Sequence, residues 1–218
     1  MGSFIVHENG ILVEQNPLLL NRLKSFRVFR ETFELGEEYF KNLLSEGELD
    51  YFTAGETLID AKEPGKYLYL LVKGELSVLV TGLSGVEKEE VAHLKSGEFF
   101  GEMALLTNDI SSAEVNVSGK VKEAITFKIA FSKLLSLSDH SDLSLETKIV
   151  LYRQIVHLLR WRNDLYRIRF PYNILACKPY TVAPFSGVNW STEELHSLHN
   201  QSRALAVRLK ELNASLGS

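Results

Sequence analysis

The stretch Phe99–Val117, FFGEMALLTNDISSAEVNV, joins a glycine turn, a very short helix and a strand. Gly101 allows the backbone to bend sharply and to approach a ligand closely. The residues from Glu102 to Leu106 are good helix formers and predict about one helical turn. The first N–H groups of such a turn have no partner inside the helix, and with the local dipole they favour a phosphate. The stretch therefore predicts an anion-binding pocket.

Two patterns stand in this stretch: Phe100-Gly101-Glu102-Met103-Ala104-Leu105-Leu106 and, after a short gap, Ser112-Ala113-x-Val115. Together they resemble the phosphate-binding cassette of the cyclic nucleotide-binding domain family, which includes the catabolite activator protein and the regulatory subunits of protein kinase A. The resemblance implies that helix N–H groups hold the cyclic phosphate and that Glu102 accepts a hydrogen bond from the ribose 2′-hydroxyl. It also implies an arginine directly before Ser112, where this chain has Ser111. The cassette is therefore degenerate, with cAMP or cGMP as candidate ligand.

The loss of this arginine has an appreciable energetic cost. A hydrogen bond to a charged group contributes roughly 1.5–3 kcal/mol, and loss of one partner of a buried charge pair costs about 2–5 kcal/mol. The affinity should therefore fall by roughly tenfold to a few thousandfold. Without a guanidinium nearby, the Glu102 carboxylate would be a second uncompensated negative charge beside the ligand phosphate. Either a cation arrives from elsewhere in the chain, or a cyclic nucleotide binds poorly.

A replacement cation is available near the end of a long helix predicted from about Leu143 to Phe170. Either Arg160 or Arg162 could turn towards the pocket, or the arginines there are solvated charges that complement the helix C-terminus. Lys120 and Lys122, in a predicted turn, are less favoured candidates. With Arg162 taken as the replacement, the predicted ligand-binding residues are Phe100, Gly101, Glu102, Met103, Ala104, Ser111, Ser112, Ala113 and Arg162. We expect no catalytic residue, metal ligand or cofactor.

From about Leu49 the chain shows short apolar runs separated by glycines, which is typical of an antiparallel roll or barrel. The resemblance to the family covers roughly residues 25–165 and implies an α+β fold, an antiparallel β-roll flanked by N-terminal helices and a long C-terminal helix. We interpret four glycines as turn residues that need positive φ, and only Gly101 as approaching a ligand. The four are Gly55, Gly65, Gly74 and Gly97.

Four parts follow from these patterns. Residues 1–48 form an N-terminal helical segment, with Asn16-Pro17 as one helix start. Residues 49–135 form the β-roll and residues 136–170 a dimerisation or hinge helix. Residues 171–218 form an extended linker and a C-terminal amphipathic helix.

The predicted helix at 143–170, capped by Asp142, carries two apolar stripes. One stripe is the seam Leu151, Ile155, Leu158, Arg162 and Leu165, and Val156, Leu159 and Tyr166 lie beside it. Two stripes need two covering surfaces. One can pack on the roll, and the other could form a parallel seam in a homodimer, as the resemblance implies.

Beyond Pro171 the resemblance ends. A capping box, Ser191-Thr192-Glu193-Glu194, opens a helix to about Leu216. This helix keeps a three-four apolar spacing typical of a short coiled coil, and pairing between chains or docking within the chain both explain it. The segment 171–218 could also bind a protein partner. It has no helix-turn-helix pattern and no basic stripe, which argues against DNA binding.

Composition limits the remaining classes of function. The chain has 218 residues, 45% of them apolar, and 24 basic against 28 acidic residues give a net charge of −4. This balance gives no electrostatic footprint for nucleic acid. The single cysteine, Cys177, fits a reducing compartment. We find no signal-peptide pattern and no apolar run of about 18 residues, so we expect a soluble, cytoplasmic protein without membrane contact.

Catalysis has the least support. The six histidines are scattered, and His196 and His199 share a helix face without a third metal ligand, so we interpret them as solvated surface residues. Two hypotheses remain. The chain is a sensory protein that binds a cyclic nucleotide or related nucleotide and signals through its helices to a partner. Alternatively, it is a ligand-free dimeric interaction scaffold with the same fold.

Overall fold

A computed structural model describes residues 17–61, 63–81, 88–111, 113–179 and 182–216. Two four-stranded antiparallel sheets form the roll, with strand orders β1-β8-β3-β6 and β2-β7-β4-β5. The strands are β1 (Gly47–Thr53), β2 (Thr57–Ile59), β3 (Tyr67–Lys73), β4 (Glu75–Thr81), β5 (Lys88–Lys95), β6 (Phe99–Phe100), β7 (Glu114–Val117) and β8 (Glu123–Ala130). The predicted α+β fold with an antiparallel β-roll is confirmed.

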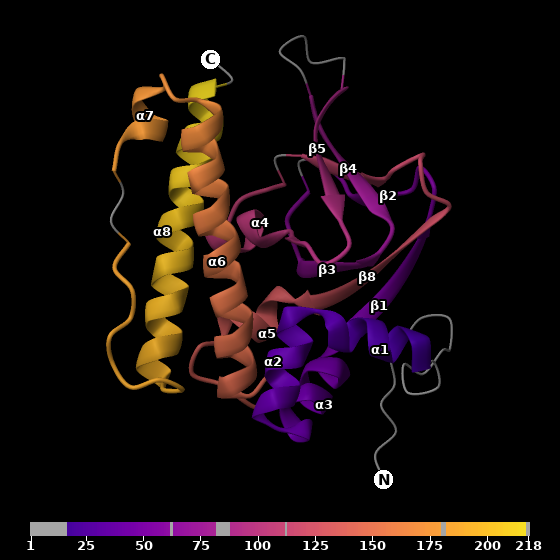
Figure 1. The fold of residues 1–218 in the computed structure, drawn as a ribbon, viewed down its shortest axis with the longest axis vertical. Helices are drawn as coiled ribbons and strands as arrows, with labels where there is room; N and C mark the ends of the chain where they lie inside the picture. Colours follow the sequence, from indigo (N-terminus) through magenta and orange to yellow (C-terminus); the bar gives the residue numbers. More distant parts are fainter. Residues whose placement is uncertain (1–16, 62, 82–87, 112, 180–181, 217–218) are drawn as a thin grey trace.

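Helices flank the roll on two sides (Figure 1). They are α1 (Pro17–Ser25), α2 (Arg27–Leu35), α3 (Glu37–Glu46), α4 (Glu102–Thr107), α5 (Phe131–Leu135), α6 (Leu145–Arg169), α7 (Ile174–Cys177) and α8 (Thr192–Leu216). The helices α1 to α3 lie along one side, the long helices α6 and α8 lie along another, and α4 lies between this pair and the roll. The cassette helix therefore sits at the junction of roll and helix pair.

The sheet β1-β8-β3-β6 buries side chains on both faces, because successive residues of a strand point to opposite faces. Leu70 and Phe127 lie in a core that the sheet shares with the helices, the helix-side core. Leu71 and Ala124 lie in a second core between the two sheets, together with Leu76, Leu94, Phe100, Val115 and Val117. The near-continuous apolar run of β3, with Leu68, Leu70, Leu71 and Val72 all buried, follows from this double burial.

One of the four turn glycines was interpreted wrongly. Gly55, Gly74 and Gly97 have positive φ, as predicted, but Gly65 does not. A Cβ at Gly65 would lie 2.5 Å from the Cβ of Ala104. Gly65 is therefore required by its close packing against α4, not by a left-handed turn.

Both long helices begin with a side-chain cap. Ser144, and not Asp142 as predicted, caps α6, since its Oγ accepts from the N–H of Thr147 at 3.1 Å. At α8, Ser191 Oγ accepts from the N–H of Glu194 at 3.2 Å. The Glu194 carboxylate accepts in turn from the N–H of Trp190, one residue before the cap, at 2.6 Å. The predicted helix start is confirmed, but the Glu194 carboxylate accepts from the residue before the cap and not from the cap residue itself.

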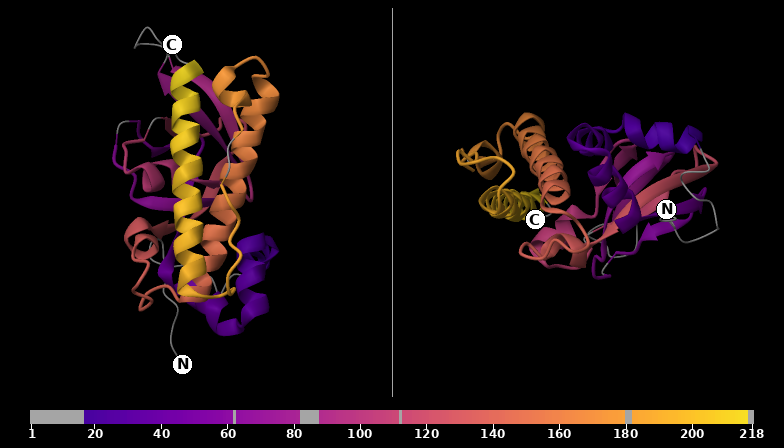
Figure 2. Two further views of the ribbon diagram at one scale, coloured as in Figure 1. Left: turned by 90° about the vertical axis from the view of Figure 1, so that its left-hand side faces the viewer. Right: turned by 90° about the horizontal axis from the view of Figure 1, so that it is seen from below.

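The helix α8 packs along α6 in the same chain, and the two run parallel (Figures 1 and 2). Residues that come later in α6 contact residues that come later in α8, as in the pairs Arg153–Glu194, Arg160–Gln201 and Asn163–Leu205. The predicted pairing of this α8 face therefore occurs within the chain. The face of α8 that lies against α6 and the core buries Leu195, Leu198, Leu205, Leu209 and Leu212.

Most of both apolar stripes of α6 is covered within this chain. Val156 and Leu159 are buried within this chain, and Tyr166 bonds to Asn213 of α8. In the other stripe, Leu151 and Ile155 are buried in the helix-side core. The two stripes therefore have both covering surfaces within the chain, one of them α8, and the homodimer itself stays a prediction.

Candidate functional site

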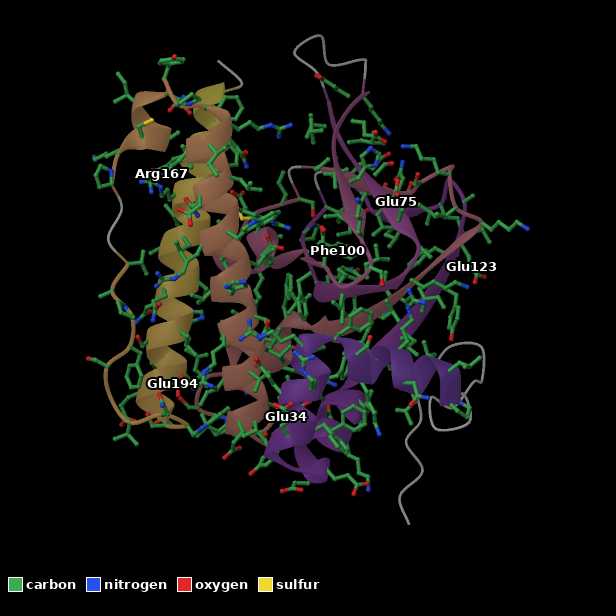
Figure 3. All side chains as sticks on the ribbon, in the orientation of Figure 1. Glu34, Glu75, Phe100, Glu123, Arg167 and Glu194 are labelled. Carbon is green, nitrogen blue, oxygen red and sulfur yellow. The ribbon has the colours of Figure 1, made fainter. Side chains whose placement is uncertain are left out.

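The glycine turn of the cassette is built against β3. Gly101 is the N-cap of α4 with φ 85°, a left-handed conformation that favours glycine. A Cβ there would lie 2.7 Å from the carbonyl oxygen of Tyr67. Phe100 is buried in the roll (Figure 3), and its ring stacks on that of Tyr69 with a centroid distance of 5.0 Å. Glycine is therefore required at position 101 by the close approach to β3, and its approach to a ligand stays a prediction.

Arg162 of α6 forms an ion pair with Glu102 at the start of α4. Its Nη1 donates to Glu102 Oε1, and its Nη2 donates to the carbonyl oxygen of Phe99 at 3.3 Å. The Glu102 side chain is 1% exposed and that of Arg162 is 25% exposed. A carboxylate this deeply buried needs a compensating charge, and the long helix supplies it.

Arg160 points elsewhere, although it is only two residues from Arg162. Its Nη2 donates to the carbonyl oxygen of Val182 at 3.0 Å and to Gln201 Oε1 at 2.9 Å. Side chains two positions apart on a helix point about 200° apart around its axis. Of the two arginines considered from the sequence, Arg162 is therefore the one at the cassette.

The rest of the predicted site lies around α4. Met103 and Ala104 are half-buried and pack against the helix-side core. Ser111 is half-buried, and its N–H donates to the carbonyl oxygen of Glu63 at 2.8 Å. Ala113 is half-buried directly before β7, and Ser112 lies outside the described residues. The ligand contacts assigned to these residues stay predictions.

Sequence reasoning missed two neighbours of the cassette. Tyr69 stacks on Phe100 of the cassette, and burial raises the pKa of its phenol to about 12. Lys210 of α8 forms an ion pair with Asp109, just after α4, and its hydrogen bond lowers the pKa of Asp109. No sequence signal links Lys210 to Asp109, because the two are 101 positions apart and meet only when α8 folds back.

The histidine, cysteine and carboxylate side chains of the described residues do not form a metal site. Within the described residues, no group of three or more His, Cys, Asp or Glu side chains could hold a metal ion. The interpretation of His199 as a solvated surface residue is wrong, since it is half-buried and its Nδ1 lies 3.1 Å from Tyr152 Oη. Burial lowers its pKa, with smaller contributions from Arg203 and His196. Among the helices of the described ranges, none is long and apolar enough to cross a membrane.

An open groove of about 590 Å³ lies on α8, lined by Val182 and Ala183 on one side and His196 and Gln201 on the other. It lies on the side of α8 that Arg160 contacts, through Gln201. The groove is therefore separate from the Glu102–Arg162 pair.

A β-roll interrupted by a one-turn helix, with a long helix lying over that turn, is the fold that the resemblance implies. Residues 49–137 match the family model described as Cyclic nucleotide-binding domain. The predicted resemblance is confirmed at this level.

Curated relatives share part of their length with this chain. The cAMP-dependent protein kinase regulatory subunit of Colletotrichum orbiculare is 39% identical over 88 residues, which are 40% of this chain and 22% of that protein. The cGMP-dependent protein kinase egl-4 of Caenorhabditis elegans is 26% identical over 124 residues, 56% of this chain and 16% of that protein. The chain thus spans about a fifth of the length of these relatives.

A solved structure supports the fold. It is a protein of Geobacter metallireducens GS-15 assigned to cyclic nucleotide binding, with a TM-score of 0.50 and 18% identity. The match covers 65% of this chain and 96% of that one. At this identity, the likeness concerns the fold alone.

Proposed function

We propose that this chain is a non-catalytic regulatory protein that binds a cyclic nucleotide, or a related nucleotide, at the cassette. It signals through α6 and α8 to a protein partner. The observation that carries the proposal is the contact between Arg162 and Glu102. It brings a guanidinium from α6 to a cassette that has Ser111 where the family's arginine would stand.

The chemistry of this contact suits a ribose phosphate. A guanidinium has five N–H donors in a rigid fork, and the contacts to Glu102 and Phe99 leave donors for a phosphate oxygen. Arg162 contacts Oε1 of Glu102, and we assign Oε2 as acceptor for a ribose hydroxyl. Glu102 is then no longer an uncompensated charge beside the phosphate. Arg162 of α6 thus contacts the phosphate directly and the ribose through Glu102.

The relatives support a regulatory role and suggest the ligands. Their names refer to cAMP and cGMP, and these are the candidate ligands here. We propose that the segment 171–218, which lies outside the matched domain, contacts the partner. A cytoplasmic location and the absence of DNA and membrane binding stay predictions from composition.

Isothermal titration calorimetry with cAMP and with cGMP tests the proposal, after mass spectrometry for any nucleotide carried through purification. We expect saturable binding, and Glu102→Ala should weaken it more than tenfold, since a hydrogen bond to a charged group contributes roughly 1.5–3 kcal/mol. Glu89→Ala, at an exposed position of β5, is the matched control and should leave the affinity unchanged. Equal affinity in Glu102→Ala would remove the cassette from the mechanism.

The second candidate function is the ligand-free interaction scaffold. It is favoured by Ser111, and by the fact that the Glu102–Arg162 pair already neutralises the cassette without a ligand. On this account no heat appears with either nucleotide up to millimolar concentration, while the protein is folded and empty.

The homodimer stays part of the proposal in a reduced form. Three residues of α6 that α8 leaves uncovered are exposed: Trp161 (52%), Leu165 (38%) and Ile168 (76%). Their spacing of four and three residues suits a helix seam. We propose this short stripe, and not the buried Leu151 and Ile155, as the contact between two copies.

A further inference from the structure

The side chains of Arg162 and Asn163 tie α6 to two different elements. Arg162 reaches the cassette at Glu102. Asn163 is 0% exposed and donates from Nδ2 to the carbonyl oxygen of Leu205 in α8 at 3.3 Å. The helix α6 is therefore held at this level between the cassette on one side and α8 on the other.

The cassette helix also contacts α8 directly. Beyond the C-terminal end of α4, Asp109 pairs with Lys210 of α8, while Glu102 at its other end pairs with Arg162 of α6. The side chains of Lys210 and Asp109 are 59% and 40% exposed. Such an exposed pair contributes little on its own, but it shows that α4, α6 and α8 meet at one junction.

The packing of α8 includes polar groups. Buried polar side chains lie among its leucines: Glu194 (3% exposed), Gln201 (7%) and Ser202 (0%). Among the described residues, the buried Oδ1 of Asn163 has no hydrogen-bond partner, and such a buried unsatisfied group lowers stability. The α6–α8 contact is therefore less strongly held than an apolar core of the same size.

The segment that leads from α6 back to α8 is largely exposed, although Ala176 is 1% exposed and Arg208 of α8 donates to the carbonyl oxygens of Leu175, Ala176 and Lys178. Tyr172, Ile174 and Val188 are 97%, 89% and 78% exposed. Hence α8 is held to the molecule chiefly by its own inner face.

From this junction we infer that α8 is a detachable strap under the control of the ligand. This inference rests on the proposed function. Docked α8 keeps α6 against the cassette and so keeps Arg162 at Glu102, and α8 acts as a positioning element without touching the ligand. Coupling between two binding events is reciprocal. A ligand that contacts Arg162 therefore favours docked α8, and release of α8 lowers the affinity for that ligand. Released α8 offers its leucine face to a protein partner.

Leu209→Glu places a charge on the inner face of α8, where Leu209 is 3% exposed. Val207→Glu is the matched control on the outer face, where Val207 is 45% exposed. Calorimetry with cAMP and cGMP should show an affinity loss of about tenfold or more for Leu209→Glu and none for Val207→Glu. Hydrogen exchange at 67–73 checks that the roll is folded. Unchanged affinity in Leu209→Glu, with fast exchange at 192–216, would overturn the inference.

A measurement without ligand separates this inference from the proposed function. In Arg162→Gln, which loosens α6 from the cassette, amides of 192–216 should exchange several-fold faster than in the unsubstituted chain, with 67–73 unchanged. This readout also decides the matter if Leu209→Glu unfolds the roll. Absence of nucleotide binding in the unsubstituted chain refutes the proposed function. Unchanged exchange at 192–216 in Arg162→Gln refutes the strap.

Discussion

The β-roll and the α6–α8 pair both bury apolar side chains, but the two regions differ in how each is held together. The core between the two sheets is formed by apolar residues such as Leu71, Leu76 and Val117. The helix pair mixes its leucines with buried Asn163 and Ser202. Buried polar side chains occur in both regions, since Thr126 of β8 is also 0% exposed. The strands, however, are joined by backbone ladders, whereas α8 is held by side-chain contacts, which indicates a rigid frame and a more easily opened attachment. Arg162 lies where the two regions meet.

The largest contrast should appear in leucine truncations. Leu71 in the roll and Leu205 in α8 are both 0% exposed. Leu71→Ala should lower the free energy of unfolding by about 2–5 kcal/mol in urea titrations, because a core cavity forms. Leu205→Ala should cost less globally and instead speed hydrogen exchange at 192–216. An equal global loss in the two variants, with uniform exchange, would contradict the distinction between frame and attachment.

A smaller effect is expected at the junction. Arg162→Gln leaves the Glu102 carboxylate buried without its partner, which should lower the free energy of unfolding by about 1–3 kcal/mol. The loss is limited because Arg162 is a quarter exposed and water can reach the site. The double variant Glu102→Gln, Arg162→Gln removes both charges and should regain most of the stability. If it regained none, the ion pair would not be the cause.

Tyr69 gives the roll a response to alkaline pH. Burial raises its pKa to about 12, against about 10 in an unfolded chain. The neutral phenol therefore stabilises the fold fully below pH 10, and this contribution is lost as the pH rises from about 10 to about 12. Urea titrations between about pH 9 and pH 11 should show a shallower decline in Tyr69→Phe than in the unsubstituted chain. Parallel declines would show that Tyr69 has no such role.

The smallest effect concerns assembly. Because only a short stripe of α6 remains exposed, we expect weak self-association that Leu165→Glu abolishes. Sedimentation at increasing concentration measures it, with Arg167→Glu as a control on the same helix. Identical sedimentation of Leu165→Glu and the unsubstituted chain would remove this stripe from the interface.

The pattern of the roll was readable because its determinants are local. Turn glycines such as Gly74 and alternating apolar residues in β3 and β8 act within a few residues of one another. Gly65 was misread, since its requirement comes from Ala104, which reaches it only in the folded chain. Ser144 was missed as a cap because Asp142 offers an equally suitable side chain two residues earlier.

The helix pair was predicted less well for a different reason. Apolar spacing shows that a face is covered, but it does not show what covers it. The face of α6 with Val156 and Leu159 suited a second chain as well as it suits α8. In the site, Glu102 could be predicted from its cassette position, and Arg162 only as one of several candidate cations. Asp109 and Lys210 depend on the return of α8 and left no local signal.

The central claim is that Arg162 supplies the cation that the cassette lacks. Calorimetry with cAMP and cGMP on Arg162→Gln, Arg162→Lys and Arg167→Gln tests it most directly. Arg167 is an exposed arginine on the same helix and serves as the control. We predict an affinity loss of at least about tenfold for Arg162→Gln, a smaller loss for Arg162→Lys and none for Arg167→Gln. Equal nucleotide affinity in all three variants and the unsubstituted chain would contradict the claim.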